Sequence, residues 1–319
     1  MLHNWYSNSK RDFAYTLSAA LGIIILDYKL AWKDALFTLQ KSGFRYDING
    51  LRAWAVLSVV LFHFLVPGFS GGFAGVDVFF VISGWLMTDI IVSGLHQQRF
   101  RLGTFYLSRA KRIFPALIVL VLVLLGAGWF VLPTPDYQEL GSQSGYALSF
   151  ISNIDFARAD SYFDSNAHEK WLLHTWSLGA EWQFYMAFPL FLMLVAKLTG
   201  GRLPWIFAAL VGLVVSSFLY SVWLSARAPT DAFYLLPTRA WEMAAGGVVF
   251  MLSKMQKKPK VPHWLYGLGW LFMLGTFALV NSETQWPGPW AVFAVLGTML
   301  ILLRSGKKTH LFVTLLPNG

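Results

Sequence analysis

The sequence predicts an all-α fold: a polytopic bundle of transmembrane helices. Of the 319 residues, 56% are hydrophobic and 13% are charged, and the mean hydropathy is +0.53. These values are too apolar for an ordinary soluble domain. The apolar residues also fall in runs of about 17 to 25, the length at which a helix crosses a bilayer. The chain contains no cysteine, which excludes disulfides and thiolate metal sites.

Eight such runs are present, and each is bounded by proline, glycine or charged residues, as the ends of membrane helices are. Their approximate ranges are 51–67, 73–94, 112–133, 174–197, 204–224, 237–253, 264–281 and 289–303. Segment 13–26 is apolar but short for a span, and we interpret it as interfacial or a partial helix within an N-terminal extension, 1–43. The terminal LFVTLLPNG looks like a truncated ninth span, so we expect 44–319 to form a C-terminally incomplete membrane domain.

The basic residues predict the orientation of the spans. If the N-terminus is cytoplasmic, 21 of the 25 Lys and Arg residues fall on the cytoplasmic side, as the positive-inside rule requires. That side then carries a basic cluster within 99–112, and the outer side carries a long acidic and polar loop, 134–172. The charged residues that give the net charge of +9 lie between the spans. The charge therefore indicates topology and gives no reason to expect a nucleic-acid partner.

The first span contains Arg52 and His63. Their separation of eleven residues is close to three helical turns, so both lie on one face, roughly 16 Å apart along the axis. Arg52 is expected at the cytoplasmic rim and His63 near or beyond the midplane. Ionisable groups inside a span are costly and mark candidate functional sites. The alternative is that Arg52 reaches lipid headgroups and His63 hydrogen-bonds a neighbouring helix.

The second span contains Asp77, with Ser83 and Gly84 about two turns later. The depth of Asp77 would allow it to pair with His63, and such a carboxylate can fix the tautomer of an imidazole that acts as a general base. The alternative is that Asp77 faces water at the outer end, while the small residues let helices approach closely.

Arg109 and Arg112 lie three residues apart at the cytoplasmic entry of the third span. Their guanidinium forks suit the phosphates of an anionic donor such as a coenzyme A thioester, although arginines here also serve as a topology signal that contacts lipid headgroups. The fourth span opens with His174 and Glu181, two turns apart in the outer half. Such a glutamate fits a proton relay or a buried ion pair.

Two further patterns limit the chemistry. Arg239 and Glu242 at the start of the sixth span are three residues apart and are expected to pair with each other. The seven histidines form no HxxxH or HExxH pattern, and no glycine-rich phosphate loop precedes a helix. The sequence therefore predicts no metal site and no soluble nucleotide chemistry.

Four segments in order, RAWAVLSVVLFHF, GGFAGVDVFFVISGWLMT, FYLSRAKRIFPAL and HTWSLGAEWQFY, resemble the membrane acyltransferase family 3, the bacterial O-acyltransferases of surface polysaccharides. TRAWEM at 238–243 also resembles a recurrent family segment. The resemblance covers roughly 44–303 and implies a core of about ten helices, of which the last two are absent from these residues. It implies transfer of an acyl group, usually acetyl, from cytoplasmic acyl-CoA to a sugar hydroxyl outside the bacterial cytoplasmic membrane.

The resemblance also implies roles for individual residues. Arg52 and His63 match the family's first-helix pair, and Arg109 and Arg112 match its cytoplasmic arginine motif. Its second-helix motif is matched by Asp77, Ser83 and Gly84. Glu181, with His174 just before it, matches the fourth-helix motif. Trp182 stands where relatives often repeat the glutamate. We interpret Arg52, Arg109, Arg112 and Ser83 as binding acetyl-CoA, and His63, Asp77, Glu181 and His174 as catalytic, with His63 a general base or a transient acyl carrier.

Acceptors implied by the family are surface polysaccharides such as lipopolysaccharide, or their lipid-linked precursors, with membrane lipids and an extracytoplasmic domain or protein as further partners. The main alternative is a transporter or flippase for a lipid-linked sugar, in which the same charges line a pathway and no covalent bond changes. A non-catalytic scaffold is a second alternative, and it would tolerate alanine at His63, Arg109 and Arg112.

Overall fold

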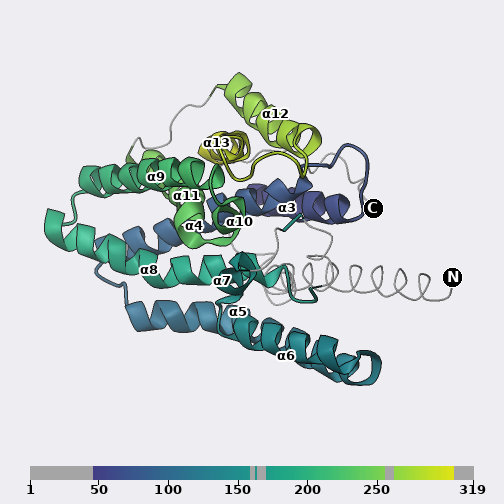
Figure 1. Ribbon diagram of the computed structural model, residues 1–319. Coiled ribbons are helices and arrows are strands. Elements are labelled where there is room, and N and C mark those ends of the chain that lie inside the picture. The colour runs from purple at the N-terminus through teal and green to yellow at the C-terminus, as the bar shows by residue number, and fades with distance from the viewer. Residues whose placement is uncertain (1–45, 159–161, 164–169, 256–261, 305–319) are drawn as a thin grey trace, which may run out of the picture.

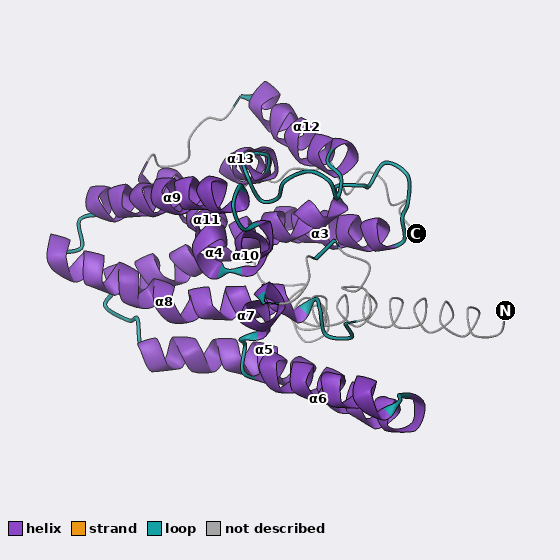
Figure 2. Ribbon diagram, in the orientation of Figure 1, coloured by secondary structure: helices purple, strands orange, loops and turns teal. Residues whose placement is uncertain are grey.

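The computed structural model describes residues 46–158, 162–163, 170–255 and 262–304, and within these ranges the regular structure is entirely helical (Figure 2). The helical fold class is therefore confirmed. The N-terminal extension, segment 13–26 and the truncated ninth span lie outside the described residues.

Eight long helices match the eight predicted apolar runs. They are α3 (Tyr46–His63), α4 (Gly75–His96), α5 (Leu102–Val131), α8 (Thr175–Thr199), α9 (Leu203–Ser225), α11 (Leu236–Met255), α12 (His263–Leu279) and α13 (Ala291–Arg304). Within the described residues, four segments are long and apolar enough to cross a bilayer: α4 together with the short 3-10 turn η1 (Gly72–Ala74) before it, α5, α8 and α9. The chain is thus a multi-pass membrane protein, and eight crossings remain a prediction.

One local expectation was wrong: the expected loop at 134–172 contains α6 (Thr134–Leu148) and α7 (Ser152–Ala157). Helix α5 begins at Leu102, before the apolar run predicted at 112–133, so Arg109 and Arg112 lie in the N-terminal half of this helix. A proline in the first turn and Asp136 near the N-terminus favour the start of α6. A search for apolar runs misses this helix because its sequence, TPDYQELGSQSGYAL, is largely polar.

Helix α4 lies near the centre of the bundle (Figure 1), packed against α3, α8, α11 and α13. Its approach to α11 is close because glycines lie at the contact. A Cβ on Gly84 would overlap the carbonyl oxygen of Met243, and one on Gly246 would overlap that of Val81. Small residues allow this backbone proximity in membrane bundles, where van der Waals packing replaces the hydrophobic effect between helices.

We predict that Gly84→Ala destabilises the bundle by about 1–3 kcal/mol, because the methyl group forces α4 away from α11. Thermal unfolding in detergent measures the effect. Gly212→Ala on α9 is the matched control, since a Cβ there has no neighbour within 4 Å and alanine is the better helix former. Equal melting temperatures for the two variants would contradict the close crossing.

Candidate active site

A pocket between four helices contains five of the predicted site residues. Arg52 comes from α3, Ser83 from α4, Arg109 and Arg112 from α5, and Glu181 from α8. The remaining lining residues are Leu86, Met87, Ile113 and Tyr185. The fold therefore brings together residues that lie as far as 129 positions apart in the sequence. The donor-binding set proposed from the sequence thus shares one cavity.

Glu181 is held in this pocket by two hydroxyl groups. Ser83 Oγ and the Tyr185 hydroxyl each donate a hydrogen bond of 2.5 Å to Glu181 Oε1. Tyr185 follows Glu181 by four residues, so both side chains lie on the same face of α8. Tyr185 was not among the predicted site residues, although this spacing within GAEWQFY could have identified it. Glu181 also lines the same pocket as the three arginines, so these groups lie together although the sequence placed them at different depths.

The arginines of the pocket carry unused hydrogen-bonding capacity. Nε of Arg52 and Nε of Arg109 are buried and make no hydrogen bond within the described residues. Among the lining residues, three are cationic and only Glu181 is acidic. Because an unpaired buried donor costs free energy, this arrangement is suited to an anion that accepts hydrogen bonds from several guanidinium groups, as a phosphate does.

His63 and His174 meet in a second cluster. Their rings are 4.6 Å apart between centroids, at an interplanar angle of 73°. The Tyr162 hydroxyl lies 3.2 Å from His63 Nε2, and burial raises the pKa of this hydroxyl above its usual value, so it stays protonated at neutral pH. The sequence analysis did not identify Tyr162, because it lies between helices, where no periodicity marks it. His63 itself is the last residue of α3.

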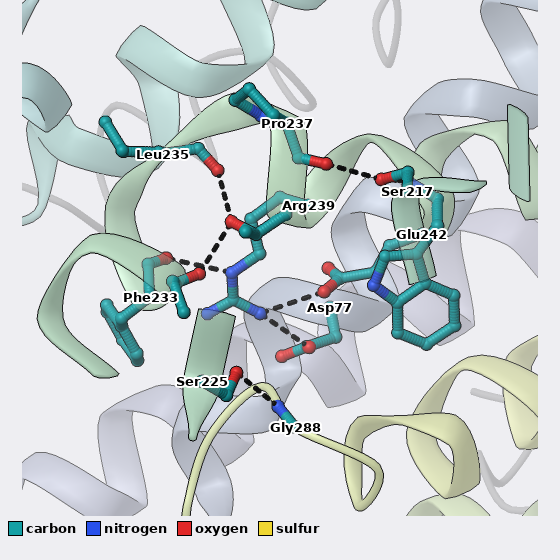
Figure 3. A network of polar contacts seen from close by, with 12 residues as sticks. Asp77, Ser217, Ser225, Phe233, Leu235, Pro237, Arg239, Glu242 and Gly288 are labelled. Carbon is teal, nitrogen blue, oxygen red and sulfur yellow. Dashed lines mark hydrogen bonds and ion pairs between the residues drawn. The ribbon is translucent and has the colours of Figure 1, made fainter. Parts of the chain in front are cut away.

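Asp77 belongs to a third cluster, shown in Figure 3. Arg239 Nη1 lies 2.9 Å from Asp77 Oδ1 and 2.9 Å from Glu242 Oε1, and the three side chains are at most 1% exposed. Arg239 Nε donates a hydrogen bond of 2.9 Å to the carbonyl oxygen of Phe233. The predicted Arg239–Glu242 pair is confirmed. The expected pair between Asp77 and His63 is replaced by the ion pair with Arg239, because a buried carboxylate is stabilised best by an opposite charge.

Comparisons with known proteins identify the family of the chain. A family sequence model described as an acyltransferase domain matches residues 45–312. The chain is 36% identical over 220 residues to a Komagataeibacter xylinus protein named as a membrane-bound transacylase, BcsY, covering 69% of this chain and 53% of that protein. It is 32% identical over 282 residues to the peptidoglycan O-acetyltransferase OatA of Listeria monocytogenes, covering 83% of this chain and 44% of OatA.

A Staphylococcus aureus protein named as an O-acetyltransferase is 29% identical over 261 residues, which cover 77% of this chain and 42% of that protein. The chain thus spans about half the length of the curated relatives it matches. No solved structure matches it.

We predict that Arg239→Gln destabilises the protein by about 3–5 kcal/mol, because it leaves two buried carboxylates without their counter-charge. The melting temperature and the yield of folded protein in detergent measure this loss. Arg227→Gln is the matched control, since Arg227 is exposed and packs on Trp223 at the protein surface. A variant at Arg239 as stable as the control would show that the cluster contributes little to folding.

Proposed function

Because the chain belongs to the membrane acyltransferase family 3, we propose that it acts in a membrane O-acyltransferase. The reaction moves an acyl group, with acetyl as the expected one, from cytoplasmic acyl-CoA to a hydroxyl of an extracytoplasmic glycan or its lipid-linked precursor. The observation that carries the proposal is the pocket in which Arg52, Arg109 and Arg112 converge beside the Ser83–Glu181–Tyr185 hydrogen bonds.

The chemistry of the pocket supports an acyl-CoA donor. Coenzyme A carries several phosphate groups, and guanidinium groups bind phosphate through paired, charge-assisted hydrogen bonds. The buried Nε donors of Arg52 and Arg109 would gain partners when such an anion binds. The pocket is lined on another side by Leu86, Met87 and Ile113, which suit an apolar part of the donor.

His63 is the proposed catalytic group. A neutral imidazole can accept the proton of the acceptor hydroxyl as its oxygen attacks the thioester carbonyl, after which the carbon–sulfur bond breaks and the thiolate leaves. In the other route, His63 carries the acyl group for a short time before transfer. His174, in ring contact with His63, would orient it or share the proton.

The acceptor and the location are proposed on indirect grounds. The name of OatA states that it acetylates peptidoglycan, which supports a cell-surface glycan as the acceptor class. The distribution of Lys and Arg supports a bacterial cytoplasmic membrane with the N-terminus inside. With that orientation Arg52 lies nearer to the donor side along α3, and His63 lies at the end of α3 that is nearer to the acceptor.

We predict that His63→Ala abolishes the transfer of labelled acetyl from acetyl-CoA to envelope glycans in inverted vesicles, because it removes the base or carrier. The product is measured as label in a base-labile glycan ester. His263→Ala is the matched control, since His263 is exposed and contacts Arg304 at the start of α12. Transfer that persists in His63→Ala refutes the role of His63, and sugar transport without any ester product would favour the flippase.

We predict that Arg109→Ala raises the KM for acetyl-CoA about tenfold or more, the loss expected for a hydrogen bond to a charged group. Arg101→Ala is the control, because Arg101 is exposed and does not line the pocket. A donor without phosphates, acetyl-pantetheine, should be used equally well by Arg109→Ala and the unchanged chain. If Arg109→Ala impairs both donors equally, phosphate binding is not its role.

A further inference from the structure

Arg239 is fixed on every side although the reaction proposed above does not use it. Its side chain is 1% exposed, and Asp77 and Glu242 hold Nη1. The guanidinium group also lies over the rings of Trp176 and Phe233, at 5.5 and 4.9 Å from their centroids. A cation with this many partners in a membrane bundle has one available orientation.

The partner that leads away from the ion cluster is Phe233, in the short helix α10 (Pro229–Tyr234). Its carbonyl oxygen accepts the hydrogen bond of Arg239 Nε, as Figure 3 shows. Thr238 holds the same segment through hydrogen bonds of 2.7 Å to the carbonyl oxygens of Ala232 and Leu235. Helix α11, on which both Arg239 and Thr238 lie, therefore holds one side of α10, which also packs against α7 and α9.

The ring of Phe233 then holds Tyr162. The two rings stack with centroids 4.6 Å apart and an interplanar angle of 21°. Tyr162 is 5% exposed, and its hydroxyl lies 3.2 Å from His63 Nε2. Since the hydroxyl projects along the axis of the phenol ring, the packing of the ring sets whether it reaches His63, and the contact with Phe233 is the closest ring contact that Tyr162 makes among the described residues.

We propose that Arg239 is a positioning residue for His63, acting through Phe233 and Tyr162. The catalytic role of His63 rests on the proposed function, but the position of its side chain in the fold does not. Arginine suits this position because a planar fork can donate to the Phe233 carbonyl and to two carboxylates at once, whereas the single ammonium of lysine cannot reach all three. The opposing view is that the ion cluster only stabilises the fold, in which case the surroundings of His63 do not change in any variant that folds.

The test measures how fast diethyl pyrocarbonate modifies His63 in the membrane-embedded chain, by peptide mass spectrometry. The exposed His263 is the internal reference. The variants are Tyr162→Phe, Phe233→Leu and Arg239→Lys, and Phe233→Leu keeps the backbone carbonyl that Arg239 needs. We expect each to raise the rate at His63 relative to His263 about fivefold, the factor carried by one ordinary hydrogen bond. Phe218→Leu is the matched control, because Phe218 packs on Trp241 and not on Tyr162.

Two results would overturn the proposal. An unchanged rate in Tyr162→Phe would show that the hydroxyl does not hold His63. A raised rate in Tyr162→Phe with unchanged rates in Phe233→Leu and Arg239→Lys would show that Tyr162 is placed without Arg239. These rates do not depend on acyl transfer, so the proposal can fail or stand apart from the proposed function.

Turnover gives a second readout where transfer is measured. Phe233→Leu should lower kcat by up to about 100-fold, the effect of a small misplacement of a reacting group, while the KM for acetyl-CoA stays within about twofold because the arginine pocket is untouched. Adding Tyr162→Phe should cost little more, since both substitutions break the same connection. Independent, additive losses would contradict a common path, and activity retained by His63→Ala would instead refute the role of His63.

Discussion

The close crossing of α4 and α11 is the constraint on which the polar clusters depend. Helix α4 carries Asp77 toward the ion cluster and Ser83 toward the pocket, while α11 carries Arg239 and Glu242. Gly84 lies next to Ser83 in the chain and directly against the α11 backbone. The distance between the two helices therefore sets the length of the Asp77–Arg239 ion pair. It also sets the position of Ser83 in the wall of the pocket.

Arginine has two different roles in this bundle, and the number of its partners separates them. Arg239 uses Nε and Nη1 on a carbonyl and two carboxylates. In contrast, Nε of Arg52 and Nε of Arg109 are buried and without a hydrogen bond in the described part of the chain. Removing a buried cation that is paired with carboxylates destabilises the fold, whereas an unsatisfied donor inside a membrane protein is costly and indicates a ligand. Hence the pocket, and not the ion cluster, is the place to expect the anionic donor.

Local sequence patterns predict the helices and much of the pocket, but not the contacts between distant segments. Apolar runs of bilayer length locate the eight long helices, and a spacing of three predicts the Arg239–Glu242 pair. The partner of Asp77 lies 162 residues away, and depth alone pointed to His63 instead. Tyr162 lies in a connection without periodicity and meets His63 across 99 residues. Such contacts follow from how the helices pack, which single-sequence patterns do not encode.

Two helices connect the arginine pocket to the histidine cluster and fix the distance between them. Helix α3 carries Arg52 in one and His63 in the other. Helix α8 carries Glu181, and His174 caps its N-terminus, so the order along the chain is reversed. The rise along α3 makes the separation roughly 16 Å. A donor whose phosphates stay with the arginines must extend an arm over that distance to present its thioester to His63. Coenzyme A, the proposed donor, has such an arm in its pantetheine, so under this proposal the donor remains anchored while its acyl end reaches across the bundle.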